Sequence, residues 1–408
     1  MLSEEAIEKL VQPIVDRQEA ISNYVIQMIA KRIKEIGKLK PSDVYKLQRL
    51  MAMGADVRLI NEELARLTAL QVTDIKRLIR KVAVDSYVMA KPLYDYRHKA
   101  FIPIEKNKNL MNIVKAIQNQ TAETYVNMSK STAFMIRDLK NPKVLTPTAV
   151  SKTYRTAVDE AIQAVQSGVT DYGSAMRRTL KQLNESGLRY VNYRPESGGM
   201  YTQRLDTALR RNILDGVRAI NQGVQDEVGK QINADGKELS VHAMSAPDHE
   251  PIQGHQFTNE EYSKLQNSQP FQDVTGTLFG AIERHIGQYN CHHFTWSIII
   301  GVNKPNYTEA QLENLKERNN AGYTLPNGKH MTLYECSQKM REMETAIRRA
   351  KEGAMMAQEA GNKDLAKEYS AKASQLAKEY KAFAKACGLT PDMGRCSVPG
   401  YKRISKSA

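Results

Sequence analysis

Apolar residues recur every three or four positions through most of the first 145 residues. The segment 20–36, for example, places Ile21, Val25 and Ile29 on one stripe, which is the spacing of an amphipathic helix. The same spacing predicts further helices over residues 44–53, 56–67 and 74–88. We therefore predict a helical N-terminal module over 1–145.

A second helical block follows over residues 146–236. Its periodicity predicts helices over residues 148–167, 172–186 and 203–228. Gly187 is expected to end the middle helix, because glycine readily adopts the left-handed conformation found just past a helix C-terminus. The polar, glycine-containing stretch 190–199 is predicted to be a loop.

The pattern changes at Lys237. Residues 238–243 alternate between apolar and polar, and 289–302 are rich in β-branched and aromatic residues, so both stretches predict strands. Between them, Thr258 and Glu261 have the spacing of a capping box, which opens a short helix. We predict a small α+β domain over 237–305.

The remaining residues, 306–408, are predicted to be helical again. Two long helices over 332–358 and 363–387 are joined at residues 360–362 and form an antiparallel hairpin. The second helix carries an apolar stripe of Leu365, Tyr369, Leu376, Tyr380, Phe383 and Cys387. After it, 395–406 form a basic tail that we expect to be loose. The fold class is therefore predominantly α with a small α+β domain.

Composition excludes several classes of protein. The chain has 408 residues, of which 41% are hydrophobic and 25% charged, as in ordinary globular proteins. The longest apolar run, around 296–302, is too short to span a bilayer. The N-terminus has no basic segment followed by an apolar stretch, so no secretory signal is expected. Four cysteines are too few for a disulfide framework and suit a reducing cytosol.

The chain is basic, with a formal net charge of +14. This charge favours an acidic partner such as nucleic acid. The basic clusters at 31–34 and 76–81, however, lie in segments with a helical pattern, where basic residues more often form a solvent-exposed helix face than a binding site. The chain has 19 Tyr and only 7 Phe. Because tyrosine combines an apolar ring with a polar tip, this excess suits surfaces that become interfaces.

Six of the eight histidines lie between His242 and His293. A cysteine thiolate with imidazoles is a ligand set that zinc prefers, so His242, His249, Cys291 and His293 are the candidate ligands of a structural zinc ion. The spacing matches no standard zinc finger. The alternative is a cluster of polar residues that hydrogen-bond a loop-rich domain, with Cys291 as a small buried apolar residue.

A cysteine nucleophile is the second possible chemistry of this region. His242 or His249 would activate Cys291, and Asp248 would orient the histidine. On a strand, Cys291 and His293 share one face. The acidic residues Asp248 and Glu250 are further candidate metal ligands. The sequence has no phosphate-binding glycine loop, no HExxH motif and no serine-elbow pattern.

Several short motifs occur in a characteristic order along the chain. They are 187–193 (Gly-Leu-Arg-Tyr-Val-Asn-Tyr), 210–214 (Arg-Arg-Asn-Ile-Leu), 240–242 (Ser-Val-His), 246–249 (Ala-Pro-Asp-His), 253–254 (Gln-Gly) and 290–293 (Asn-Cys-His-His). In this combination, the whole chain resembles the second minor capsid protein family of tailed phages, which is related to the Mu F-like minor head proteins.

The resemblance implies a virion protein made in the bacterial cytoplasm. Related minor head proteins associate with the portal vertex, enter the procapsid in few copies, and influence DNA packaging or ejection. The positions that match the signature of the family's small domain are His242, His249, Gln253, Gly254, Cys291 and His293. The sequence departs from the usual pattern at Asp248, His255 and His292, where the family often has Ser, Lys and Arg.

We therefore expect a structural minor head protein without enzymatic activity. Its expected partners are the portal protein, the major capsid protein and packaged double-stranded DNA bound independently of sequence, with no membrane. The alternatives are a Cys/His or metal-dependent hydrolase carried in the virion, and a non-specific DNA-binding protein of the head interior.

Overall fold

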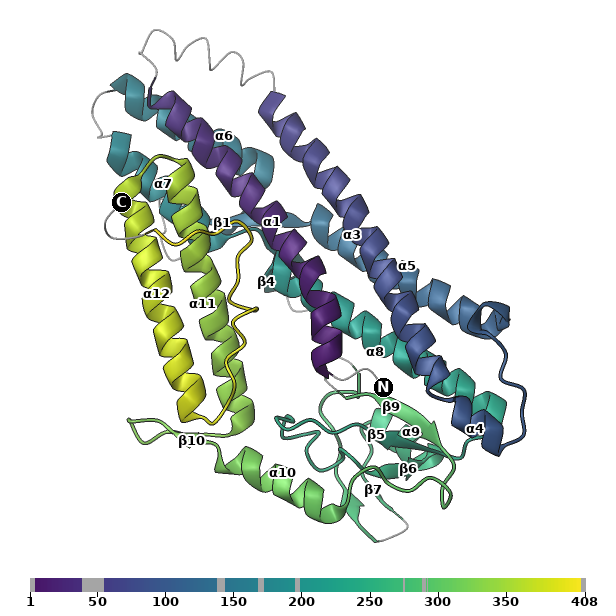
Figure 1. Cartoon of the computed structure of the whole chain (residues 1–408). Helices are drawn as coiled ribbons and strands as arrows, with labels where there is room; N and C mark the ends of the chain where they lie inside the picture. The colour runs from purple at the N-terminus through teal and green to yellow at the C-terminus, as the bar shows by residue number, and fades with distance from the viewer. Residues whose placement is uncertain are drawn as a thin grey trace. The chain divides into compact units, whose positions relative to one another are not determined.

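The computed structural model describes residues 4–38, 55–137, 144–167, 172–194, 199–273, 276–287, 291 and 293–404. Helices predominate, with small sheets between them (Figure 1), which confirms the predicted fold class. None of the described helices is long and apolar enough to cross a membrane.

Spatial contacts group the chain into two compact units, each built from three segments. The first unit comprises residues 1–12, 73–124 and 210–339, and the second comprises 13–72, 125–209 and 340–408. The sequence predicts four domains along the chain, over residues 1–145, 146–236, 237–305 and 306–408. These boundaries stay a prediction.

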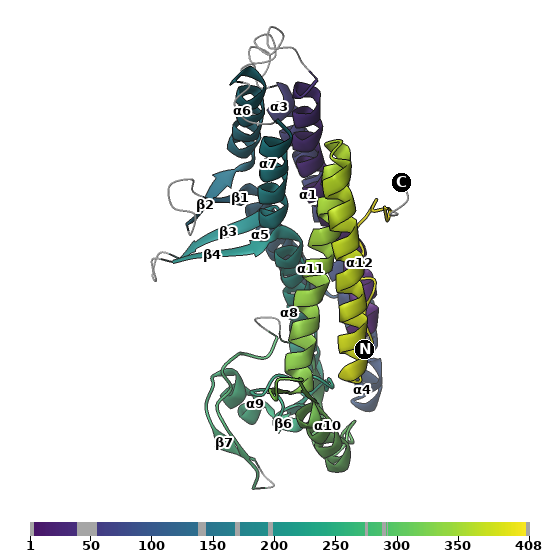
Figure 2. The ribbon, with the colours of Figure 1, turned by 90° about the vertical axis from the view of Figure 1, so that its left-hand side faces the viewer.

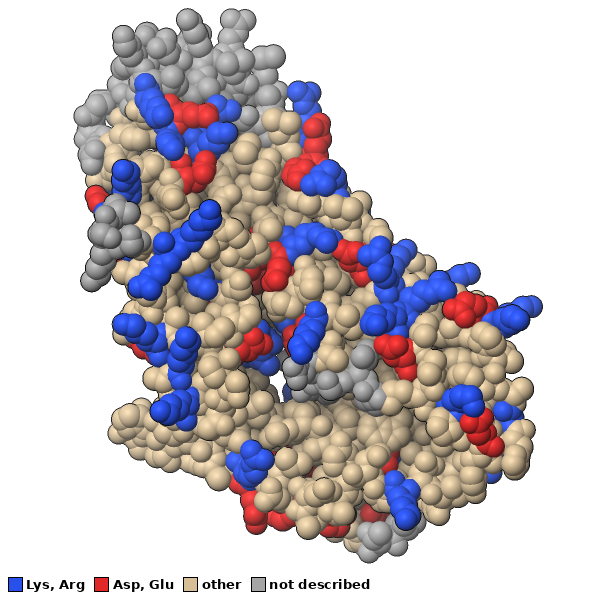
Figure 3. All heavy atoms as spheres, viewed as in Figure 1, with Lys and Arg blue, Asp and Glu red and all other residues tan. Residues whose placement is uncertain are grey.

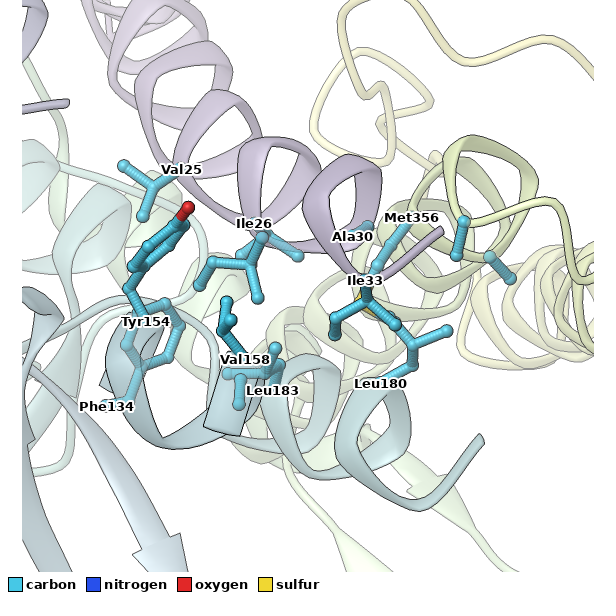
Figure 4. Close-up of a cluster of buried hydrophobic side chains, with 14 of the residues drawn as sticks. Val25, Ile26, Ala30, Ile33, Phe134, Tyr154, Val158, Leu180, Leu183 and Met356 are labelled. Atoms are coloured by element: carbon cyan, nitrogen blue, oxygen red, sulfur yellow. The ribbon is translucent and has the colours of Figure 1, made fainter. Parts of the chain in front are cut away.

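The core of the second unit lies among its helices. Helix α1 (Glu4–Ile36) contributes Val25, Ile29 and Ile33, each fully buried. These side chains pack against residues of α6 (Val150–Ser167), α7 (Tyr172–Ser186) and α11 (Leu333–Glu359), as Figure 4 shows. The three- and four-residue spacing seen in the sequence thus marks the face of α1 that is buried.

An antiparallel sheet of four strands also belongs to the second unit. Its order is β2-β1-β3-β4, with β1 (Thr132–Arg137), β2 (Leu145–Ala149), β3 (Arg189–Arg194) and β4 (Gly199–Arg204). The prediction of a loop over 190–199 was wrong, since β3 and β4 pair from Arg189 with Arg204 to Arg194 with Gly199. Tyr190 and Val191 are good strand formers, and pairing with β1 provides partners for the backbone of this polar stretch. Residues 195–198 lie outside the described part.

The predicted C-terminal hairpin is confirmed. Helices α11 and α12 (Lys363–Ala386) run antiparallel side by side (Figures 1 and 2), and Asn362 caps α12 by accepting a hydrogen bond from the N–H of Leu365. The stripe residues of α12 face the core: Leu365, Tyr369, Tyr380 and Cys387 are buried, and Leu376 and Phe383 are half-buried.

The residues after α12 are not loose, contrary to expectation. Cys396 is fully buried, Arg395 pairs with Glu344 of α11 at 2.9 Å, and the hydroxyl of Tyr401 lies 3.1 Å from that of Ser370. The positive charges of this segment suggested a solvated tail, but the carboxylate of Glu344 and the apolar side chains between the charges anchor it. Residues 405–408 lie outside the described part.

In the first unit, long helices pack against one another through buried hydrogen bonds of polar side chains as well as through apolar contacts. They are the last part of α3 (Ala55–Val88), most of α5 (Lys108–Lys130) and most of α8 (Leu205–Ile232), together with α4 (Lys91–Tyr96) and a short 3-10 helix (Ile104–Lys106). Ser86 donates to Asn221 at 2.9 Å, and Asn212 donates to the carbonyl of Thr121 at 2.8 Å. Helix α3 joins the two helices predicted over 56–67 and 74–88, because no helix breaker separates them. The helix predicted over 44–53 lies outside the described residues.

The small α+β region also belongs to the first unit. Strands β5 (Gly236–Leu239), β6 (Gln256–Thr258) and β9 (Thr295–Ile298) form an antiparallel sheet of order β6-β5-β9. The predicted strands over 238–243 and 289–302 are therefore shorter than expected. The capping box at Thr258 opens α9 (Asn259–Gln266), as predicted. The remaining elements are β7 (Phe271–Gln272), β8 (Leu278–Phe279), α10 (Glu309–Ala321), β10 (Tyr323–Thr324) and β11 (His330–Met331).

Candidate metal centre

The pairing of β5 with β9 brings two histidine-containing segments to the same end of the sheet. Leu239, the last residue of β5, pairs with Thr295, the first residue of β9. The chain leaving β5 and the chain entering β9 therefore start at the same end of the sheet, and Ser240 and Phe294 exchange hydrogen bonds of 2.8 Å there. One segment carries His249, and the other carries Cys291 and His293.

Three of the four predicted ligands converge. The ligand atoms of His249, Cys291 and His293 all lie within 4.8 Å of one another. The Sγ atom of Cys291 is 3.4 Å from Nδ1 of His249 and 3.4 Å from Nδ1 of His293. The three residues are buried, with exposed fractions of 1%, 3% and 2%.

The opposite nitrogen of each imidazole is held by an oxygen. Nε2 of His249 donates to the backbone carbonyl of Arg284 at 2.6 Å. Nε2 of His293 lies 3.4 Å from Oε1 of Gln253, an oxygen that also accepts from the backbone N–H of His242 at 3.1 Å. Because a carbonyl oxygen only accepts, both Nε2 atoms carry the proton in the neutral ring. Both Nδ1 lone pairs then face the sulfur.

The surroundings favour the thiolate of Cys291. Burial raises the pKa of this thiol. When Nδ1 of His249 is protonated as well as Nε2, its hydrogen bond and positive charge, together with backbone N–H groups, outweigh burial and bring the pKa of the thiol below its usual value. For His249, burial lowers the pKa, whereas the hydrogen bond and charge of Cys291 outweigh burial and raise the pKa. The thiolate is the form of cysteine that binds metals and attacks electrophiles.

Comparison with known proteins decides the family. The family model described as phage minor capsid protein 2 matches residues 2–385. The chain belongs to this family. No curated protein and no solved structure matches the chain. Family membership makes the protein a structural phage protein of the virion.

The fourth predicted ligand of the minor capsid protein, His242, lies beside the three others rather than among them. Its ring centroid is 4.6 Å from that of His293, and its side chain is half-buried. His255 also lies apart, since its ring packs on Phe257 and Phe279. His292, which follows Cys291 in the sequence, lies outside the described residues.

The two acidic candidates have other partners. Asp248 accepts from the guanidinium of Arg284, with Nε at 3.1 Å, and this pairing holds the pKa of Asp248 below its usual value although burial opposes it. Glu250 accepts from the side-chain amide of Asn319 at 2.8 Å. These carboxylates therefore support the loop around His249, and neither belongs to the group of converging ligand atoms.

The arrangement differs from the predicted Cys-His-Asp constellation. Nε2 of His249 is 3.6 Å from Asp248 but 2.6 Å from the carbonyl of Arg284. The carbonyl, not the carboxylate, therefore orients the imidazole. Sequence reasoning missed this role of Arg284, because a backbone carbonyl leaves no signal in the residue types.

Gly254, one of the residues shared with the family signature, is required by packing next to the site. Its φ of +76° is a conformation that residues with a Cβ rarely adopt, and a Cβ there would lie 2.5 Å from Leu312 and 2.7 Å from Val241. The glycine thus allows the chain from His249 to return into β6 under helix α10.

Proposed function

We propose that this minor capsid protein acts at the portal vertex of the phage head, where it assists head assembly, DNA packaging or DNA ejection. The observation that carries the proposal is the family match over residues 2–385. The proposed partners are the portal protein and the major capsid protein, and synthesis takes place in the host cytoplasm.

The chemistry of the histidine-rich region supports a structural role. Cys291 is only 3% exposed, and its two imidazole neighbours are buried as well. A nucleophile needs access to a substrate carbonyl or phosphoryl group, whereas a buried cluster is suited to holding a fold together.

The decisive experiment is quantitative mass spectrometry of purified particles, comparing empty procapsids, full heads and particles that have ejected their DNA. We expect the protein in all three at the same low ratio to the portal protein. Loss on ejection would contradict residence at the vertex and favour an ejected internal protein. Absence from every particle would contradict the proposed function altogether.

Binding to duplex DNA is a second candidate function, favoured by a basic helix surface. Lysines lie along α12 with few acidic side chains among them in the view of Figure 3. Those with exposed side chains are Lys363, Lys372, Lys378, Lys381 and Lys385. Such a row of positive charge would contact phosphates without reading sequence, so that binding weakens steeply with salt.

The DNA candidate is tested with the full chain and a duplex of random sequence at several salt concentrations. Binding that weakens with salt and is reduced by the double change Lys378→Glu and Lys381→Glu would support it. Equal binding by this variant and the unmodified chain would assign any DNA contact to another surface.

A hydrolase in the virion is tested through Cys291. Particles carrying Cys291→Ala that assemble and infect normally would exclude nucleophilic catalysis by this residue. Particles that assemble normally but fail to infect would favour the hydrolase over the structural role.

A further inference from the structure

We propose that His249, Cys291 and His293 bind one Zn²⁺ ion per chain, through Nδ1, Sγ and Nδ1 respectively. The ion would join the loop between β5 and β6 to the segment that enters β9. This inference is independent of the role proposed at the portal vertex.

The hydrogen bonds made by the Nε2 atoms of the two imidazoles leave both Nδ1 atoms as electron-pair donors. Together with the sulfur of Cys291, they form three donor atoms that lie close together. The carbonyl of Arg284 fixes the proton of His249 on Nε2, and Gln253 does the same for His293. The amide of Gln253 is itself oriented, because its oxygen accepts from the backbone N–H of His242. A cation satisfies all three donors at once.

The distances suit a tetrahedral ion. With Zn–S bonds of ~2.3 Å and Zn–N bonds of about 2.0–2.1 Å, a tetrahedral angle separates sulfur from nitrogen by about 3.5 Å. Both observed separations between Sγ and Nδ1 are 3.4 Å. The ligand set therefore needs little rearrangement to accept the ion.

The second layer of contacts is that of a metal site. Histidine ligands of zinc commonly donate their other ring N–H to a carbonyl or carboxylate, which fixes the ring. Here Arg284 and Gln253 supply those acceptors, and Asp248 in turn binds the side chain of Arg284. Nitrogen and sulfur ligands together select zinc over the oxygen-preferring calcium and magnesium.

A metal would also add a cross-link to this region. Its sheet has three strands of only three or four residues, and its apolar cluster is small. The proposed ion connects two segments 42 residues apart in the chain. Binding releases the proton that Cys291 and His249 share in the metal-free protein, and it couples metal affinity to folding.

His242 is assigned as a neighbour and not as a ligand. Its ring packs against that of His293 at 4.6 Å between centroids, but it does not belong to the group of ligand atoms that lie within 4.8 Å of one another. Among the described residues, three side chains thus form the ligand set. His242→Ala is therefore a matched control within the same cluster.

The test measures metal content of the purified full chain by native mass spectrometry and elemental analysis. We expect one zinc per chain in the unmodified protein, in His242→Ala and in Cys336→Ser, whose buried thiol belongs to the same unit. Zinc is expected to be lost from Cys291→Ser and His293→Ala. Circular dichroism establishes that each variant is folded.

Cobalt substitution provides a readout on the unmodified chain, in case Cys291→Ser does not fold. A Co²⁺-loaded protein should show the thiolate-to-cobalt charge-transfer band in the near ultraviolet and the intense visible bands of tetrahedral coordination. Absence of the thiolate band would overturn the assignment of Cys291.

Four further results would contradict the proposal or its set of ligands. One is an unmodified chain that binds no zinc when zinc is supplied, and a second is equal zinc content in Cys291→Ser. Rapid alkylation of Cys291 in the metal-free protein, with no protection by zinc, would instead establish a thiolate–imidazolium pair. Loss of zinc from a folded His242→Ala would overturn the set of three ligands.

Discussion

The guanidinium of Arg204, at the end of β4, donates two hydrogen bonds to the carboxylate of Glu352 on α11, with Nη1 3.0 Å from Oε2 and Nη2 2.5 Å from Oε1. Both side chains are buried. Arg204 also pairs with Asp206 at 3.1 Å, and Arg348 links Asp206 to Glu19 of α1. A buried charge network therefore holds together segments of the second unit that are distant in sequence.

We expect Arg204→Met to destabilise the second unit by ~3–5 kcal/mol, because it leaves two carboxylates buried without their main partner. Arg177→Met is the matched control, since Arg177 pairs with Glu368 on the surface of the same unit. That change should cost about 0–1 kcal/mol. Chemical denaturation followed by circular dichroism measures both. Similar losses for the two variants would mean that the buried network contributes no more than a surface pair.

Glu19 makes the stability of this network depend on pH. Burial, and then the charge of Glu352, raise the pKa of Glu19 to about 9, although Arg348 opposes the shift. The folded chain therefore keeps a proton that the unfolded chain releases above its ordinary pKa of 4.5. The resulting stabilisation is complete below pH 4.5 and falls as pH rises towards 9, by at most about 1.4 kcal/mol per unit.

The variant Glu19→Gln isolates this effect, since it keeps the shape of the protonated acid. We expect its thermal midpoint to rise relative to the unmodified chain as pH increases from 5.5 to 8.5. A difference between the two proteins that is constant over this range would show that Glu19 is ionised in the folded state.

Gly322 is expected to tolerate no side chain. It ends α10 with a φ of +44°, and a Cβ there would lie 1.9 Å from the carbonyl oxygen of Met331. Gly322→Ala must displace backbone and should destabilise the first unit by more than ~2 kcal/mol. Gly328, in the turn between β10 and β11, also has a positive φ but open space around it, so Gly328→Ala should cost about 1 kcal/mol. Urea denaturation of the two variants gives the comparison, and equal costs would contradict the steric argument.

Gln253 is predicted to set the affinity of the proposed zinc site without binding the ion. Gln253→Met removes the acceptor of Nε2 of His293, so zinc affinity should fall about 10–100-fold while one ion still binds at saturation. The control is Gln256→Met in β6, whose amide donates to Glu238 and Asn303. A competition titration with a zinc-binding dye measures both. An unchanged zinc affinity in Gln253→Met would show that Gln253 does not support the zinc site.

Local patterns predicted the buried faces of several helices and some helix ends, although the helices predicted over 56–67 and 74–88 form the single helix α3. The spacing of Ile21, Val25 and Ile29 predicted the buried face of α1, and the capping box at Thr258 predicted the start of α9. These features depend on residues three or four positions apart, so the sequence contains all the information that they need. The density of histidines likewise located the candidate site.

Partners far along the chain were decided only by the tertiary structure. The stretch 190–199 was predicted to be a loop, and its strands form only because β3 pairs with β1 and β4. Nothing near Arg204 in sequence indicates Glu352. Among the four candidate ligands, the pairing of Leu239 with Thr295 brings His249 to Cys291 and His293, whereas His242 lies to one side. Residue types specify which chemistry is available, but convergence of ligand atoms within a few ångströms depends on sheet register and packing, which involve contacts tens to hundreds of residues apart.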